Sequence, residues 1–177
     1  MQDFLELARR RQSCRAYADK PVEKEELLAL AEAARLAPSA CNSQPWTLVA
    51  ATGESAKAVA GCVQQLGLNK FAAQCPAFLV VVEEKAKLMQ RVAETVASQH
   101  FAPIDIGLMT AHICLQATDR GLGTCVLGMF DDKGLRRALD IPDKKEIRLV
   151  IAVGYPADDK VRPKVRRELD EIIRFVE

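Results

Sequence analysis

The stretch Pro38-Ser39-Ala40-Cys41-Asn42-Ser43-Gln44-Pro45-Trp46 separates an amphipathic pattern from an apolar run, and it is the most informative part of this sequence. Each proline fixes its own φ near about −65° and favours extended geometry in the residue before it, so a helix should end close to Ala37. Four hydrogen-bonding side chains lie between the prolines: Ser39, Asn42, Ser43 and Gln44. A small polar loop held between regular elements suits a flat, hydrogen-bonding ligand better than a core.

The residues around this loop predict alternating helices and strands. Apolar residues at helical spacing indicate a helix over 23–36, and its acidic first turn suits the positive end of a helix, where those carboxylates should be solvated. The unbroken apolar run at 77–82 and the run at 147–153, which only Arg148 interrupts, indicate strands buried on both faces. The remaining patterns predict helices at 2–11, 55–66, 86–99 and 131–140, and strands at 46–51 and 124–127.

The segment from Pro103 to Gly121 has almost no polar face, so it predicts a helix that needs cover all round. In a chain of this size we expect a second subunit to supply that cover, which places this helix at the centre of a homodimer interface. The alternative is a central helix wrapped by its own domain. Gly121 should stop the helix, because Gly121-Leu122-Gly123 precedes a strand and is therefore a poor dinucleotide fingerprint.

Length and composition limit the possible classes of protein. The 177 residues fit one domain spanning 1–177, and a net charge of +1 argues against a surface built for nucleic acid or for an anionic membrane. No signal-peptide pattern and no apolar run long enough to span a membrane is present, so we expect a cytoplasmic protein. The six cysteines lack metal-ligand spacing, so we expect reduced, mostly buried thiols and no metal site.

Two basic segments could bind an anion. The run Arg9-Arg10-Arg11 is either a solvated helix end or part of a phosphate site, to which Ser13 could add a donor. The charged run that contains Lys164 and Arg166 is a second such segment, although a charged terminal run is most often solvated. No Ser/His/Asp set, Cys/His pair or metal cluster stands out, and both histidines are isolated. A polar ligand loop without catalytic machinery is best explained by a cofactor that carries the chemistry.

Together with Arg11-Gln12-Ser13-Cys14-Arg15-Ala16-Tyr17, the proline-braced loop resembles the nitroreductase family of FMN-dependent oxidoreductases. The resemblance extends from Arg11 to Ile172. It implies an α+β fold, with a mixed central β-sheet flanked by helices, and an intertwined homodimer with two FMN sites at its interface. It also implies a ping-pong reaction in which NADH or NADPH reduces the flavin and a small-molecule acceptor, such as a nitroaromatic or a quinone, receives the electrons.

The resemblance also assigns roles to particular residues. Arg11, Ser13, Lys164 and Arg166 would bind the FMN phosphate, and Arg15 would stabilise negative charge at the flavin N1/O2 edge. Gln12 stands where Arg or His is more usual. The loop would come from the opposite subunit. The full set of expected cofactor-binding residues is Arg11, Gln12, Ser13, Arg15, Pro38, Ser39, Ala40, Asn42, Gln44, Asn69, Leu127, Gly128, Lys164 and Arg166.

Several alternatives stay open at this point. Asn69 either bonds the flavin ring or simply ends a helix, and Gly128 either meets the reactive edge of the flavin or forms a plain turn. The segment 83–102 is short compared with the same region of larger family members, where it covers the substrate pocket. The substrate and the use of NAD(P)H therefore stay open. A dehalogenase-like or flavin-consuming enzyme is a second possibility. A third possibility is a flavin carrier or redox sensor that uses Cys14 and Cys41. The fourth is a nucleic-acid-binding module, which would bind DNA or RNA with strong salt dependence.

Overall fold

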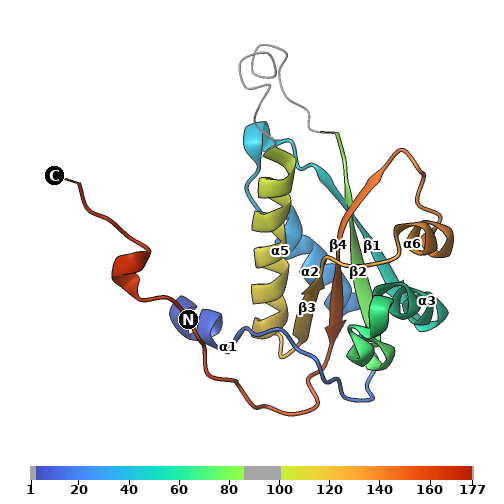
Figure 1. Ribbon diagram of the computed structural model, residues 1–177, viewed down its shortest axis with the longest axis horizontal. Helices are drawn as coiled ribbons and strands as arrows, with labels where there is room; N and C mark the ends of the chain where they lie inside the picture. The colour runs from blue at the N-terminus through green and yellow to red at the C-terminus, as the bar shows by residue number, and fades with distance from the viewer. Residues whose placement is uncertain (1–2, 86–100, 177) are drawn as a thin grey trace.

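A four-stranded sheet forms the centre of the computed structural model, which describes residues 3–85 and 101–176 (Figure 1). Its strands are β1 (Trp46–Thr52), β2 (Ala77–Glu83), β3 (Gly123–Leu127) and β4 (Glu146–Gly154). They lie in the order β1-β2-β4-β3, and neighbouring strands are antiparallel. Among the described residues one parallel pairing also occurs, an isolated bridge from Ser13 to Thr124 on the outer edge of β3. The α+β class is confirmed.

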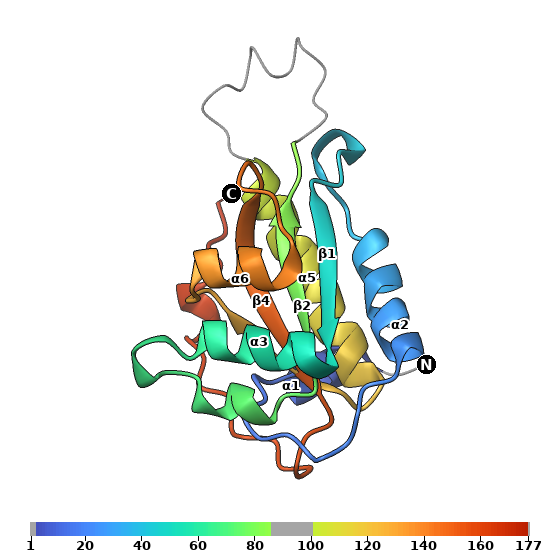
Figure 2. The same ribbon diagram turned by 90° about the vertical axis from the view of Figure 1, so that its right-hand side faces the viewer.

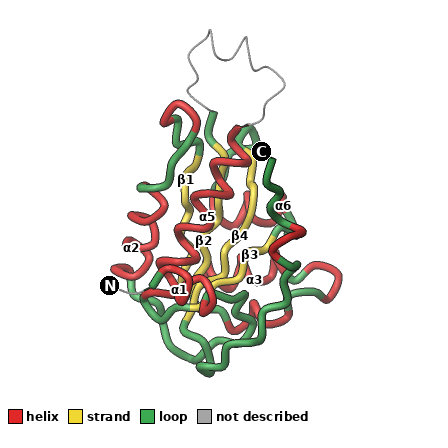
Figure 3. The backbone as a smooth tube through the Cα atoms, turned by 90° about the vertical axis from the view of Figure 1, so that its left-hand side faces the viewer, coloured by secondary structure: helices red, strands yellow, loops and turns green. Residues whose placement is uncertain are grey.

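Helices cover both faces of this sheet (Figure 2). One face carries α2 (Lys24–Arg35) and α5 (Phe101–Asp119), and the other carries α3 (Gly53–Val63) and α6 (Asp132–Leu139). The first helix, α1 (Phe4–Arg10), contacts α5 near its C-terminal end (Figure 3). Single 3-10 turns occur at Ala40–Asn42, Gln65–Gly67, Lys70–Gln74 and Leu169–Glu171. The helix expected at 86–99 lies outside the described residues.

The long apolar strands divide the core into two layers, as the unbroken apolar run of β2 predicted. On β2, Phe78 and Val80 belong to the layer under α3 and α6, whereas Leu79 and Val81 belong to the layer under α2 and α5. These four side chains are at most 1% exposed. Because alternate residues of a strand point to opposite faces, a strand covered on both faces must be apolar at every position.

Local signals explain where the helices begin and end. The Asp3 carboxylate accepts the Leu5 amide at 3.1 Å, so α1 begins one residue later, at Phe4. The helix expected at 55–66 begins at Gly53 and ends at Val63, since Leu66 and Gly67 adopt positive φ. Gly121 has φ +73° and ends α5, which confirms the predicted helix stop.

One side of α5 is buried and the other is open. Ile106, Met109 and Ile113 are at most 2% exposed against the sheet, whereas Ile104 is 58% and Leu108 42% exposed. The described part of the chain thus covers only half of this apolar helix. The homodimer that would cover the rest stays a prediction.

Two further observations concern the state of the cysteines and the length and apolarity of the helices. All six cysteines are free thiols, and Cys41 is the exposed one among them. Within residues 3–85 and 101–176, no helix is both long enough and apolar enough to cross a membrane.

Candidate functional site

The outer edge of β3 holds the segment that follows α1. β3 is the last strand of the sheet, and the Thr124 carbonyl on its free edge accepts the Cys14 amide at 2.8 Å. Gly123 makes this approach possible, because a Cβ built there would lie 2.7 Å from the Cys14 Cβ. The expected binding residues Ser13 and Arg15 are therefore held beside the edge strand. Gly123 was not among the predicted site residues.

Beyond Thr124 the same edge offers backbone groups to a ligand. Since the Thr124 carbonyl points away from β4, the alternation of an antiparallel strand also turns the Val126 N–H and C=O outward. Val126 is 44% exposed, and Gly128 is exposed just past the strand. Leu127 is buried and faces Val150 across the ladder. Val126 and Gly128 thus border the edge more directly than the predicted Leu127.

The C-terminal tail lies against this segment and brings cations to it (Figure 1). The Lys164 ammonium donates to the Arg11 carbonyl, and the Arg162 guanidinium donates to the Ser13 carbonyl. Arg162 also donates to Gln12 Oε1 at 3.2 Å, and Gln12 Nε2 donates to the Lys160 carbonyl at 2.7 Å. A glutamine at position 12 can both donate to and accept from the tail, whereas a cation there would repel Arg162.

Arg11, Arg162, Lys164 and Arg166 form a cationic cluster, in which positive charge dominates the electrostatics. Partial burial lowers the pKa of Lys164, and the neighbouring Arg11, Arg166 and Arg162 lower it further. The charges that lower the pKa of Lys164 are those of three arginines, so a bound anion would offset their repulsion. A hollow of about 300 Å³ lies beside the cluster and is lined by Gln12, Ser13, Cys14, Arg15, Ala16, Pro156, Asp158, Lys160 and Arg162.

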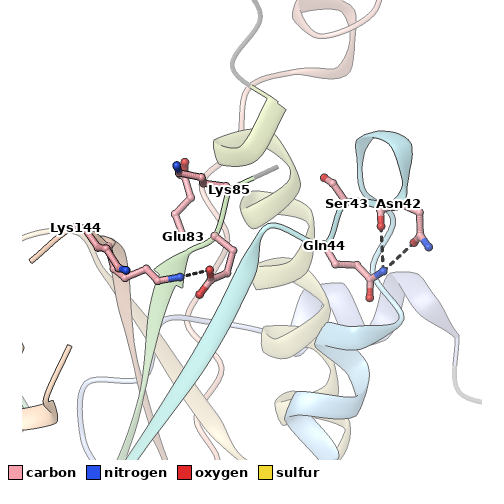
Figure 4. Close-up of a pocket in the computed structure, with 8 residues that line it drawn as sticks. Asn42, Ser43, Gln44, Glu83, Lys85 and Lys144 are labelled. Carbon is pink, nitrogen blue, oxygen red and sulfur yellow. Dashed lines mark hydrogen bonds and ion pairs between the residues drawn. The ribbon is translucent and has the colours of Figure 1, made fainter. Parts of the chain in front are cut away.

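The loop between Pro38 and Pro45 has an unusual backbone. Three of its non-glycine residues have positive φ: Cys41 (52°), Asn42 (52°) and Gln44 (46°). The Ser39 hydroxyl accepts the Gln44 amide at 3.0 Å, which closes the base of the loop. The Gln44 side-chain amide donates to the Asn42 carbonyl at 3.0 Å and to Asn42 Oδ1 at 3.2 Å (Figure 4).

The hydrogen bonds inside the loop determine what it can offer to a ligand. The Ala40 amide donates to Asp105 and the Ala40 carbonyl accepts the Ser43 amide at 3.0 Å, so only the Ala40 methyl group is free. The Ser39 hydroxyl proton and the Asn42 amide group remain as donors; Ser43 Oγ has no partner among the described residues, but it is buried. The loop therefore suits a ligand rich in acceptors.

This loop also borders a hollow of about 960 Å³ (Figure 4). Its other walls are the end of β2 and the turn before β4. Side chains of both signs line it, and the Lys145 ammonium donates to the Glu84 carboxylate. The lining residues are Asn42, Ser43, Gln44, Glu83, Glu84, Lys85, Lys144 and Lys145.

Within one chain the loop and the cationic cluster lie at opposite ends of α5 (Figure 1). Ala40 contacts Asp105 near the start of the helix, whereas Arg11 lies beside Cys114. Asp105 and Cys114 are nine positions apart in the sequence, which corresponds to about 14 Å along a helix. The structure therefore gathers Arg11, Gln12, Ser13, Arg15 and Lys164 in one place and leaves the loop residues in another.

Asn69 takes part in a helix end. Its side-chain amide donates to the Val63 carbonyl at 3.0 Å, and its own φ is +52°. This geometry is that of a helix terminator, which was one of the two roles considered for it. No hydrogen bond joins Asn69 to the loop or to the cationic cluster within the described ranges. Its contact with a flavin stays a prediction.

Comparisons with known proteins agree with this architecture. The chain matches the model described as Nitroreductase family over residues 8–65 and 53–155. It is 28% identical over 196 residues to a Streptococcus pyogenes protein with the provisional name of NAD(P)H nitroreductase, covering 96% of this chain and 98% of that protein. A solved structure of a nitroreductase family protein from Streptococcus pneumoniae superposes with a TM-score of 0.83 at 25% identity, covering 98% of this chain and all of that one.

Two more distant relatives have more specific names. The FMN reductase [NAD(P)H] of Bacillus subtilis is 24% identical over 169 residues, which cover 88% of this chain and 67% of that protein. The iodotyrosine deiodinase of Thermotoga neapolitana is 23% identical over 198 residues, covering 99% and 98% of the two chains. The family model covers most of the sequence, and the fold and the basic segment along β3 agree with it: this chain belongs to the nitroreductase family.

Proposed function

We propose that this protein is an FMN-dependent oxidoreductase that takes a hydride from NADH or NADPH and passes electrons to a nitroaromatic, a quinone or a similar acceptor. The observation that carries the proposal is the cluster around Lys164, where the charges of Arg11, Arg166 and Arg162 lie close enough to lower the pKa of the lysine. The similarity of this chain to an FMN reductase supports FMN as the ligand. The cytoplasmic location belongs to this proposal as well.

The residues present fit the phosphate of FMN. A phosphate that carries up to two negative charges needs several cations and donors if it is even partly buried. Arg11 and Ser13 would supply them from one end of the chain, and Lys164 and Arg166 from the other. The binding of a dianion would also remove the repulsion that lowers the pKa of Lys164. Gln12 would act by holding the tail in place through Lys160 and Arg162.

The edge of β3 fits the flavin ring. Arg15 is exposed, and its charge acts on Cys125 of β3, so its guanidinium can stabilise negative charge at the N1/O2 edge. The outward backbone of Val126 and the open Gly128 would border the same ring. Bound FMN would supply the hydride acceptor and electron carrier that the side chains of this chain lack. We expect donor and acceptor to use the site in turn, by a ping-pong mechanism.

The second half of the site would come from a second copy of the chain. The loop carries the donors of Ser39 and Asn42, together with Pro38, Ala40 and Gln44. It contacts α5 at Asp105, about 14 Å along the helix from Cys114, beside which Arg11 of the same chain lies. A homodimer formed through the open face of α5 could bring the loop of one subunit to the cluster of the other. It would also cover the exposed Ile104 and Leu108.

An absorbance spectrum of the purified protein, followed by anaerobic addition of NADH or NADPH, tests the proposal. We expect visible flavin bands that one of the nucleotides bleaches and that a quinone or nitroaromatic restores. A colourless protein that cannot be reconstituted with FMN would refute the assignment. Flavin that binds but is bleached by neither nucleotide would instead favour a carrier or sensor.

A reductive dehalogenase is a second candidate, favoured by the similarity to an iodotyrosine deiodinase over 99% of this chain. The discriminating assay offers iodotyrosine to the anaerobically reduced protein. Stoichiometric release of iodide with reoxidation of the flavin would support this candidate. Reoxidation by quinone without release of iodide from iodotyrosine would support the first one.

A further inference from the structure

Asp105 is a buried carboxylate that neither the motif analysis nor the expected cofactor contacts include. Its side chain belongs to α5 and the residue is 4% exposed. Both carboxylate oxygens accept the Ala40 amide, at 3.2 Å and 3.1 Å. Burial of a carboxylate is unfavourable unless its oxygens accept hydrogen bonds, and this amide is the one donor that the described residues provide.

The loop that Asp105 holds cannot be fixed by its own bonds. Ser39, Asn42 and Gln44 bond to one another, which closes the loop on itself without attaching it to α5. Positive φ at Cys41, Asn42 and Gln44 is a conformation that L-residues disfavour, and it persists only where surrounding contacts impose it. Among the described residues, the bond from Ala40 to Asp105 is the one side-chain hydrogen bond between this loop and another element.

We infer that Asp105 is a positioning residue that holds the 38–44 loop in its ligand-binding conformation and thereby sets the affinity for FMN; the second half of this inference rests on the proposed function. The Ala40 amide donates to Asp105, and the Ala40 carbonyl accepts the Ser43 amide. These two bonds fix the turn in which the donors of Ser39 and Asn42 are free. Loss of the carboxylate would release the Ala40 amide and let the strained turn relax, so the donors would have to be ordered again whenever the ligand binds.

The first test measures hydrogen exchange by mass spectrometry in the apoprotein. In Asp105→Ala we expect the amides of a 38–46 peptide to exchange about tenfold faster, because Ala40, Ser43 and Gln44 all lose protection together. Asp105→Asn keeps a carbonyl acceptor and should lie between this variant and the wild type. Thr110→Val is the matched control: this buried residue of α5 has a hydroxyl without a partner among the described residues, and its replacement should leave the peptide unchanged.

The second test measures FMN affinity for the same variants. We expect about tenfold weaker binding in Asp105→Ala, partial recovery in Asp105→Asn and wild-type affinity in Thr110→Val. Exchange of the β2 peptide 77–83 monitors the fold, and if it rises in Asp105→Ala, the Asn variant decides both tests. The partial recovery separates positioning from a general loss of stability.

The outcomes distinguish the two parts of the inference. Unchanged exchange in the 38–46 peptide of the variants would overturn the claim that Asp105 holds the loop. Faster exchange with FMN affinity within twofold of the wild type would overturn the link from loop to affinity. A wild-type protein that binds no FMN would overturn the proposed function and that link, while the exchange data would still decide whether Asp105 holds the loop.

Discussion

Replacement of Arg11 by alanine should weaken FMN binding through its phosphate alone. The Lys164 ammonium bonds to the Arg11 backbone carbonyl, so Arg11→Ala removes the guanidinium and leaves the attachment of the tail intact. Arg11 is half-buried, and a hydrogen bond to a charged group contributes about 1.5–3 kcal/mol in such settings. This range corresponds to a loss of about 10- to 150-fold in affinity.

The assay is fluorescence titration of the apoprotein with FMN and with riboflavin, which has the same ring without the phosphate. We expect Arg11→Ala to lose affinity for FMN and to keep its affinity for riboflavin. Arg9→Ala is the matched control, because Arg9 belongs to the same basic run and forms an exposed pair with Glu6 at 3.7 Å. An equal loss for both ligands, or unchanged FMN affinity, would refute the phosphate assignment.

Three other substitutions test the structure. Gly123→Ala places a Cβ 2.7 Å from Cys14, so chemical denaturation should show a free energy of unfolding lower by about 1–3 kcal/mol, and titration should show weaker FMN binding. Gly61→Ala is the control, because a Cβ at Gly61 would have no atom within 4 Å, and it should show neither effect. Equal behaviour of the two variants would contradict the packing argument. Leu108→Glu should give a monomer that releases flavin, and light scattering that still finds a flavin-loaded dimer would exclude this face of α5 as the interface. Burial raises the pKa of Cys75 to about 12, so the folded state keeps a proton that the unfolded chain loses above about pH 9. The free energy of unfolding should therefore fall by up to about 1.4 kcal/mol per pH unit between about pH 9 and pH 12, and a Cys75→Ala variant with an equally steep fall would disprove this source.

Most of the fold could be predicted because its signals are local. The apolar run of β2, the Pro38 break and the Gly121 stop each act through a few neighbouring residues. The position of β3 at the edge of the sheet could not be predicted in the same way, since it depends on pairing between distant strands. For that reason the sequence pattern did not indicate that Gly123 and the outward backbone of Val126 border the predicted cofactor site.

The site residues divide along the same line. Arg11 and Lys164 lie 153 positions apart, and the motif analysis expected them to meet, as the structure shows. Asp105 was missed despite a usable signal: it lies four residues before Met109 and eight before Ile113, in the buried stripe of α5, where a lone carboxylate is out of place. The contact between the loop and the cluster, which we propose to occur between two subunits, stays a prediction.

The tail after Pro156 has a consequence for how this protein could change over time. All four strands and the helices through α6 precede it, and the last buried core residue is Val153. The tail nevertheless supplies the lysine and arginine side chains that contact Arg11, Gln12 and Ser13. Part of the proposed phosphate site is thus encoded outside the sequence that forms the sheet and the helices that cover it. Substitutions in the tail could therefore weaken the binding of an anionic ligand while the sheet and its helices stay intact.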